Sequence, residues 1–130
     1  SIGDLLISMT GNVGRVCRVT HSLCLLNQRV GLLCPVAVSS EFLFHLLSQR
    51  SFLTSMVGKA KGGAQGNLSK SDISDYTLLV PTDPKEQAAI AQVLSDMDAE
   101  IAVLEQRRNK TKDIKQAMMQ ELLTGKTRLI

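Results

Sequence analysis

Basic and amide side chains gather in a glycine-rich segment near the middle of the chain, residues 58–67. Lysine can neutralise phosphate groups, and glutamine or asparagine can pair with the edges of bases, adenine above all. The candidates for such contacts in and just after this segment are Lys59, Lys61, Gln65, Asn67 and Lys70. The pattern indicates a nucleic-acid contact, and it is equally compatible with a surface loop whose lysines are solvated.

A second candidate contact lies in the turn at residues 10–14, where Asn12 is followed by Arg15. An asparagine can pair with adenine, and an arginine can bind guanine through two hydrogen bonds. The competing interpretation is an ordinary hairpin turn. A third basic cluster, residues 107–115, could contact phosphate. For that cluster we favour pairing with a partner or solvation, because acidic residues lie on the same predicted helix.

Few residues could bind a metal or a cofactor. Cys17, His21 and Cys24 lack the tight, repeated spacing and the fourth ligand of a zinc site, so we expect no metal. Three irregularly spaced cysteines predict buried, reduced thiols and a cytoplasmic protein rather than a disulfide framework. Gly58-Lys59 lacks the upstream glycine of a phosphate-binding P-loop. We therefore expect neither a cofactor nor a catalytic site.

Composition limits the class of protein. The 130 residues, 44% of them hydrophobic, suffice for one modest domain with a core. The net charge of +3 permits nucleic-acid binding without requiring it. Aromatic residues make up only 3% of the chain, which counts against base stacking as the main mode of binding. No apolar run approaches the ~20 residues of a membrane span.

Short segments bounded by turn residues and prolines predict a small mixed β-sheet module. The strands that we expect are residues 3–9, 15–20, 22–26, 29–34 and 76–80. One helix is expected over residues 41–57, after a serine N-cap and before Gly58 as its end. Ser69 and Asp72 have the spacing of a capping box for a further short helix. The expected fold class is therefore α+β.

The strongest signal in the sequence is one long C-terminal helix. Asp83 can cap it, Pro84 occupies the first helical position, and Gly125 ends it. The pattern spans about 40 residues, or ~60 Å at the rise of an α-helix. We accordingly divide the chain into a module at residues 1–82 and a long helix at residues 83–130.

Apolar residues along this helix recur at steps of four and three, which is the pattern of a heptad seam. The seam consists of Ile90, Leu94, Met97, Ile101 and Leu104, and it continues in phase through Arg108, Thr111 and Lys115 to Met118 and Leu122. Its middle is either a polar break or a phase shift through Ile114. Both forms predict a helix that packs against a partner.

The charges of the helix change sign along its length. Acidic residues occupy its first half, and basic residues occupy positions 107–115. An antiparallel pair with a two-fold axis near residue 106 would set opposite charges together, whereas a parallel pair would set like charges together. We therefore expect a homodimer through an antiparallel coiled coil. The alternative is a solvated amphipathic helix that folds back on its own domain.

Several segments of the chain form a set that is typical of one family. They are Gly3-Asp4-Leu5-Leu6-Ile7, Asn27-Gln28, Gly62-Gly63-Ala64-Gln65-Gly66-Asn67-Leu68-Ser69, Leu78-Leu79-Val80-Pro81, Glu86-Gln87-Ala88-Ala89-Ile90-Ala91, Asp98-Ala99-Glu100-Ile101 and residues 122–126. Together they resemble the specificity subunit of type I restriction–modification enzymes over essentially the whole chain. The most specific stretch is Pro-x-x-x-x-Glu-Gln-x-x-Ile-Ala at residues 81–91.

This resemblance implies a non-catalytic, DNA-binding role. A full subunit of the family carries two target recognition domains, each of which binds one half of a split target in double-stranded DNA. Two conserved helices pack antiparallel as a spacer between them. Methyltransferase subunits dock on these helices, and restriction subunits join to cleave. We expect this chain to begin partway into a recognition domain and to hold one such helix, so that homodimerisation would rebuild the pair.

Two functions are compatible with the sequence. The first is a DNA-binding specificity module that docks methyltransferase subunits through its long helix. The second is a dimerising scaffold that cannot bind DNA on its own, because the recognition domain is incomplete. An enzyme is disfavoured, because the sequence contains no Asn-Pro-Pro-Tyr motif of a methyltransferase and no glycine-rich cofactor fingerprint.

Overall fold

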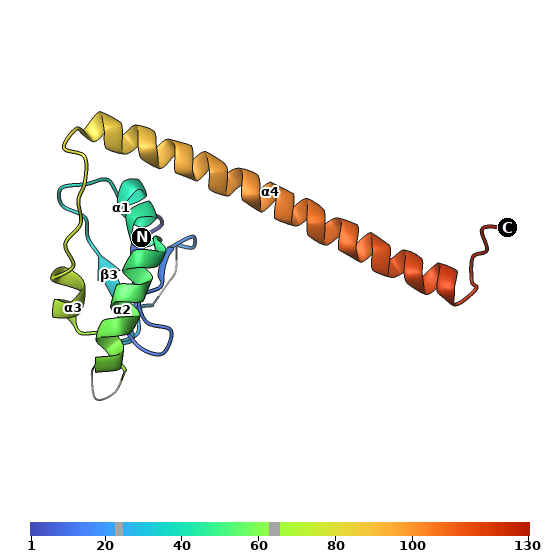
Figure 1. Ribbon diagram of the computed structural model, residues 1–130, viewed down its shortest axis with the longest axis horizontal. Helices are drawn as coiled ribbons and strands as arrows, with labels where there is room; N and C mark the ends of the chain where they lie inside the picture. The colour runs from blue at the N-terminus through green and yellow to red at the C-terminus, as the bar shows by residue number, and fades with distance from the viewer. Residues whose placement is uncertain (23–24, 63–65) are drawn as a thin grey trace. The chain divides into compact units, whose positions relative to one another are not determined.

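The computed structural model describes residues 1–22, 25–62 and 66–130 and divides the chain into two compact units, Ser1–Gln92 and Val93–Ile130. Its elements, in order, are β1 (Leu5–Ser8), β2 (Val16–Arg18), β3 (Val30–Leu33), α1 (Ser40–Leu47), α2 (Arg50–Gly62), α3 (Lys70–Ser74) and α4 (Pro84–Leu123) (Figure 1). The last helix begins in the first unit and makes up most of the second. The expected α+β class with a long C-terminal helix is confirmed.

The sheet of the first unit is antiparallel, with strand order β2-β1-β3. Leu6 in the central strand pairs with Cys17 on one side and Leu32 on the other. Because side chains alternate between the faces of a strand, Leu5 and Ile7 point to the opposite face, where both are buried. The strands expected within residues 3–9, 15–20 and 29–34 are therefore present.

The core of this unit forms where α2 packs against the buried face of the sheet. Phe52, Met56 and Ala60 recur every four residues along α2 and are buried together with Ile7 of β1. Tyr76 meets Phe52 edge to face, with ring centroids 5.0 Å apart. These contacts fix α2 on the sheet, which matters because α2 also borders the candidate site.

The prediction of one helix over residues 41–57 is wrong, because the segment forms α1 and α2. Ser39 caps α1, its hydroxyl accepting a hydrogen bond from the amide of Phe42. The amide and the hydroxyl of Ser48 both donate to the carbonyl of Phe44, so this serine closes the helix that Gly58 was expected to close. Gly58 lies inside α2 in open space, where a glycine costs only about 1 kcal/mol.

The described residues of two expected strands lie outside any strand. Residues 76–80 are not in a strand, although Tyr76 and Leu78 alternate with exposed neighbours and pack against the core. The alternation of burial is present, but none of the described strands pairs with this segment. In the segment 22–26, the described residues are likewise outside any strand, and Leu25 is fully exposed.

The cysteines also differ from expectation. Cys17 and Cys34 are exposed thiols rather than buried ones, and Cys24 lies outside the described residues. Cys17 is exposed because it shares the outer face of the sheet with Leu6, its partner in register. An apolar sequence neighbourhood therefore does not determine which face of a strand a side chain occupies.

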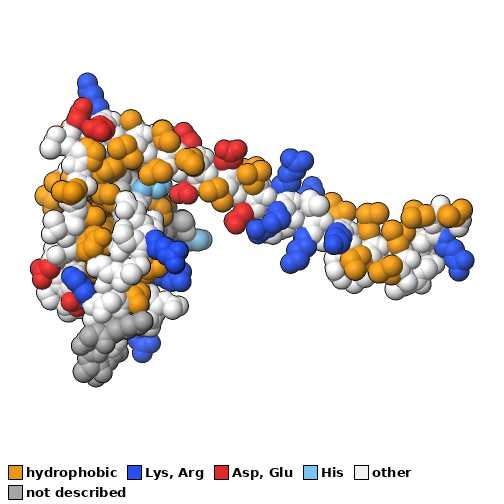
Figure 2. Space-filling model, in the orientation of Figure 1, with side chains coloured by type: hydrophobic (Ala, Val, Ile, Leu, Met, Phe, Trp, Pro, Cys, Tyr) orange, Lys and Arg blue, Asp and Glu red, His pale blue; other side chains and the backbone are white. Residues whose placement is uncertain are grey.

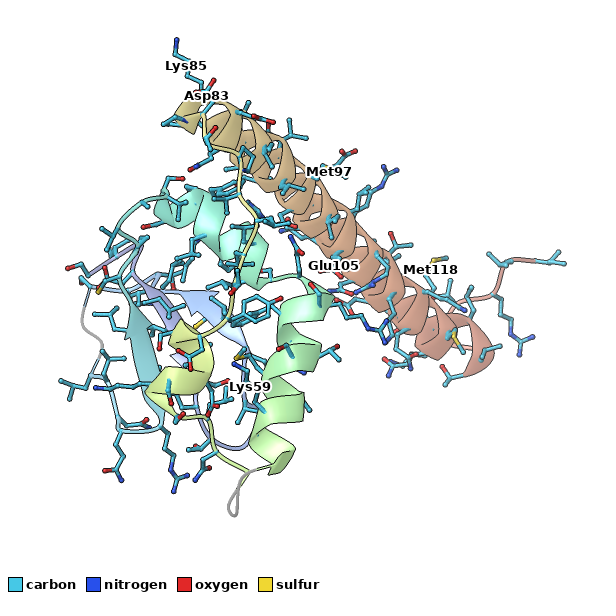
Figure 3. The ribbon with its side chains drawn as sticks, turned by 60° about the vertical axis from the view of Figure 1, so that its left-hand side comes forward. Lys59, Asp83, Lys85, Met97, Glu105 and Met118 are labelled. Atoms are coloured by element: carbon cyan, nitrogen blue, oxygen red, sulfur yellow. The ribbon has the colours of Figure 1, made fainter. Side chains whose placement is uncertain are left out.

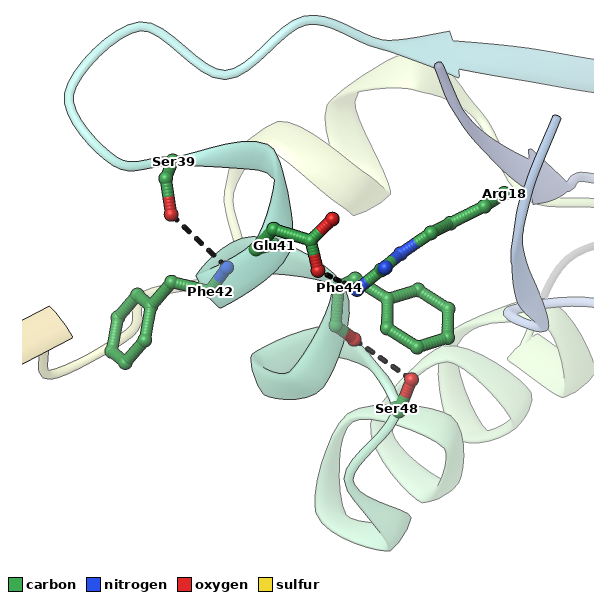
Figure 4. Close-up of polar contacts among 6 residues, drawn as sticks. All are labelled: Arg18, Ser39, Glu41, Phe42, Phe44 and Ser48. Atoms are coloured by element: carbon green, nitrogen blue, oxygen red, sulfur yellow. Dashed lines mark hydrogen bonds and ion pairs between the residues drawn. The ribbon is translucent and has the colours of Figure 1, made fainter. Parts of the chain in front are cut away.

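A charged contact ties α1 to the sheet (Figure 4). Nη2 of Arg18, in β2, lies 2.6 Å from Oε2 of Glu41, and the guanidinium stacks 4.2 Å from the centroid of the Phe44 ring. The buried Nε and Nη2 make no directed hydrogen bond to a described residue, so the contact with Glu41 is an ion pair supplemented by the cation–π contact. This basic residue is therefore structural.

Helix α4 begins and ends as the sequence predicts. Oδ1 of Asp83 accepts a hydrogen bond from the amide of Lys85, with Pro84 at the first helical position. After the helix, Gly125 has φ +74°, and its amide donates to the carbonyl of Leu122. Within the part of the chain that the structure describes, neither this helix nor any other is apolar enough to cross a bilayer.

Candidate nucleic-acid interface

The turn between β1 and β2 carries Asn12 and Arg15, and Ser8 organises it. The hydroxyl of Ser8 donates to the carbonyl of Asn12 and accepts from the amide of Arg15, 3.2 Å away. The amide of Gly14 donates to the carbonyl of Ser8 over 2.8 Å. One side chain at the end of β1 therefore closes the turn that presents both candidate residues.

The same turn is anchored on α2. Val13 is buried in the core, and Gly14 adopts φ +77° against Met56. A β-carbon at Gly14 would meet the β-carbon of Met56 at 2.6 Å, so glycine is required by both the backbone angle and the close approach. Asn12 and Arg15 thus sit on a turn whose backbone is fixed by packing.

Asn12 and Arg15 line one hollow, which has a volume of about 320 Å³. Its other described walls come from the turn, from α2 and from Gly66, which precedes α3. The two segments singled out from the sequence, the turn at 10–15 and the segment around residue 66, therefore converge at this hollow. Both side chains are exposed and form no hydrogen bond or ion pair with another described residue.

Lys59 behaves differently, because its ammonium group is engaged within the chain. The residue lies on α2 (Figure 3), not in a loop. Its Nζ donates to the carbonyl of Asp72 over 2.6 Å. Asp72 in turn forms a capping box with Ser69, as the sequence predicts. Hydrogen bonds from the hydroxyl and the amide of Ser69, and then the charge of Lys59, hold the pKa of Asp72 below its ordinary value of 3.8 against the opposing effect of burial.

The remaining candidates of the glycine-rich segment are spread over helix and loop. Residues 58–62 are helical, so the expected loop over residues 58–67 is wrong in its first half. Lys61 belongs to α2 by its backbone, its side chain is not described, and Gln65 lies outside the described residues. Asn67 and Lys70 are exposed, Lys70 at the first position of α3. Neither lines the hollow that Asn12 and Arg15 share.

No metal-binding group is formed by the described histidine, cysteine, aspartate and glutamate residues, since nowhere do three of them come together. Thr20 Oγ1 and His21 Nδ1 lie 2.8 Å apart, within hydrogen-bonding distance. The candidate contact residues of the first unit carry amide, guanidinium and ammonium groups. These groups suit recognition of bases and phosphates.

Helix α4 exposes a long apolar seam. Its members Ile90, Leu94, Met97, Ile101 and Leu104 are 36–54% exposed. Towards the C-terminus, Met118 and Leu122 line one apolar hollow together with Ile114, the residue through which the phase shift was expected. Large side chains at this exposure, repeated over a whole helix, are typical of a surface that a partner covers.

The charges of α4 are segregated along the same helix (Figure 2). Its acidic stretch is Asp96, Asp98, Glu100 and Glu105, and its basic stretch is Arg107, Arg108, Lys110, Lys112 and Lys115, interrupted by Asp113. Arg108 lies 3.9 Å from Glu105, an exposed pair of small energetic weight. An acidic stretch and a basic stretch therefore lie next to each other in the middle of α4, with apolar residues of the seam on either side.

The start of α4 is anchored by a residue that our sequence analysis did not identify as structural. Gln87 is only 6% exposed, and its side-chain Nε2 donates to the carbonyl of Pro81 over 2.8 Å. Ala91, one turn later, is also buried. A buried amide must be hydrogen-bonded, and Gln87 meets this requirement through the carbonyl of Pro81. The sequence signal that could have found it is a polar residue one helical turn before the buried Ala91.

Comparison with known proteins agrees with this arrangement. A family profile described as the type I restriction modification DNA specificity domain matches residues 1–113. No solved structure matches the chain. The match includes the β1–β2 turn, α2, α3 and most of α4. The chain therefore belongs to the family of type I restriction modification DNA specificity domains and has a specificity role in a type I restriction–modification system.

Proposed function

We propose that this chain is a non-catalytic specificity component that binds double-stranded DNA through residues 1–82 and docks partners through the helix at 83–130. The observation that carries the DNA-binding part is the convergence of Asn12 and Arg15 on one hollow. Two polar side chains that engage no described partner, held on a fixed turn, are suited to contacting DNA. Lys61, Gln65, Asn67 and Lys70 are further candidate contacts, and Lys59 would have to leave Asp72 to join them.

The proposed partners of α4 are a second copy of the chain and methyltransferase subunits. Restriction subunits would then join the resulting complex. Support for the homodimer comes from the exposed seam and from the opposite charges of the two halves of the helix. An antiparallel pair centred near residue 106 sets Leu94 opposite Met118 and Ile90 opposite Leu122. It also sets the acidic stretch opposite the basic stretch, which favours this orientation.

Duplex DNA of random sequence, titrated with the full chain across a salt series, tests the DNA-binding proposal. We expect the logarithm of the affinity to fall linearly with the logarithm of salt concentration, because phosphate contacts release counterions. Arg15→Ala should weaken binding, whereas Arg50→Ala, which removes an exposed arginine outside the hollow, should change it little. No binding at the lowest salt concentration would instead support a dimerising scaffold without DNA binding.

A further inference from the structure

The β1–β2 turn combines two properties. Its backbone is fixed, because Val13 is buried, Gly14 packs on Met56 and Ser8 bridges the turn. Its side chains are uncommitted, because the amide of Asn12 and the guanidinium of Arg15 contact no described polar partner. Discrimination among bases needs donors and acceptors held in place to within about 0.5 Å, which a packed turn provides and a free lysine does not.

The walls of the hollow add a third kind of contact. Next to the polar groups of Asn12 and Arg15, Val57 and Ala60 of α2 supply an apolar wall. None of the described residues that line the hollow carries a carboxylate, so nothing there opposes an electronegative base edge. The hollow therefore combines an amide, a guanidinium and an apolar surface.

These three groups match the edges of bases in the major groove of DNA. Asparagine pairs with N6 and N7 of adenine, arginine with O6 and N7 of guanine, and an apolar surface accepts the C5-methyl group of thymine. A phosphate can accept hydrogen bonds from both Asn12 and Arg15, but it has no group that would occupy the apolar wall. The combination favours sequence recognition over backbone binding.

We propose that the β1–β2 turn determines sequence specificity. In this proposal Asn12 contacts the adenine of an A·T pair, the thymine methyl group of that pair enters the hollow against Val57 and Ala60, and Arg15 contacts a neighbouring guanine. The proposal rests on the DNA binding proposed above, and it adds which residues select bases and which bases they select.

Selection of bound sequences from a duplex library with a randomised centre tests the proposal, using the full chain and its variants Asn12→Ala, Arg15→Ala and Arg50→Ala. Wild type should enrich a motif that contains an A·T pair beside a G·C pair. Asn12→Ala should reduce discrimination at the A·T position about tenfold or more, and Arg15→Ala at the G·C position. Arg50→Ala should leave the motif unchanged.

A second measurement addresses the apolar wall. Uracil in place of thymine in the enriched duplex removes only the methyl group, so wild type should bind it about fourfold more weakly. The loss should be unchanged in Arg50→Ala. Equal affinity for the thymine and uracil duplexes would show that the proposed contact between the thymine methyl group and the hollow is wrong.

The remaining outcomes separate this proposal from the one on which it rests. If wild type binds the library and the Asn12 and Arg15 variants weaken all sequences equally, the turn contacts only the backbone and the specificity proposal is wrong. Binding without any enriched motif also overturns it, while DNA binding itself stands. If wild type binds no DNA even at low salt, the DNA-binding proposal fails and the specificity proposal fails with it.

Discussion

A β-carbon on Gly14 would lie 2.6 Å from the β-carbon of Met56. This close approach presses the β1–β2 turn onto α2 and so fixes the position of Asn12 and Arg15. Met56 is buried in the core, whereas Asn12 and Arg15 on the same turn are exposed at the candidate interface. The stability of the fold and the geometry of the site are thus connected at one residue.

Gly14→Ala should lower the free energy of unfolding by about 2 kcal/mol or more, because the new methyl group meets Met56 and the backbone has φ +77°. Gly11→Ala is the matched control, since Gly11 has a similar φ of +70° but open space around it. That variant should lose only about 1 kcal/mol. Chemical denaturation measures both values, and equal losses would mean that the approach to Met56 is not tight.

A second prediction concerns the capping box of α3. Because the pKa of Asp72 is lowered in the folded state, its carboxylate stabilises the fold above the pKa of the unfolded chain, near 3.8, and loses this effect as the pH falls through the folded-state pKa. Asp72→Asn should therefore destabilise the protein near pH 7 and differ little from wild type below both values. Denaturation as a function of pH measures the difference. A difference that is constant over the whole range would contradict the assignment.

Asp75 offers the control for this experiment. It follows α3 directly as the C-cap residue, and its carboxylate takes no part in the Ser69 capping box. Asp75→Asn removes the same charge from the same neighbourhood. It should not reproduce the pH-dependent loss of stability that Asp72→Asn causes.

Local signals predicted helix ends well and strand partners poorly. The limits of α4 followed from the sequence, because the end signals Asp83, Pro84 and Gly125 act on residues no more than three positions away. Residues 76–80 have the alternation of a strand, but a strand also needs a partner elsewhere in the chain. Gly58 does not end the helix as expected. The helix-propensity cost of one exposed glycine is smaller than the stabilisation from burying Phe52, Met56 and Ala60.

The types of residue in the candidate site could be predicted from the sequence, but which of these residues lie together could not. Asn12, Arg15 and the segment near Gly66 were singled out separately, and only the packing of the turn on α2 brings them to one hollow. The engagement of Lys59 by the carbonyl of Asp72 could not be predicted either. That contact depends on how α2 and α3 meet, which no local pattern specifies.

A third prediction concerns the start of α4. Gln87→Leu keeps the approximate volume of the side chain but leaves the carbonyl of Pro81 without its donor, which should cost about 1–2 kcal/mol of unfolding free energy. Gln120→Leu, at an exposed position of the same helix, should leave stability nearly unchanged. Thermal or chemical denaturation compares the two variants. Equal stability of both would indicate that the hydrogen bond of Gln87 contributes nothing.

The last prediction tests the direction of the proposed helix pair. Asp98 and Lys112 each follow a seam residue directly, Met97 and Thr111, so both flank the seam on the same side. In an antiparallel pair centred near residue 106, Asp98 of one copy lies near Lys112 of the other, and symmetry gives this contact twice. In a parallel pair Asp98 of one copy and Lys112 of the other lie about 21 Å apart along the helix axis and do not meet.

Asp98→Lys alone and Lys112→Asp alone should each weaken the antiparallel dimer about tenfold, because two attractive contacts become repulsive. The double variant, in which the charges are exchanged, should recover the affinity of wild type. Sedimentation equilibrium at low salt measures the dissociation constants, and high salt should reduce the differences because exposed charges are screened. In a parallel pair Asp98 and Lys112 do not meet, so unchanged affinity in all three variants would sink the antiparallel arrangement.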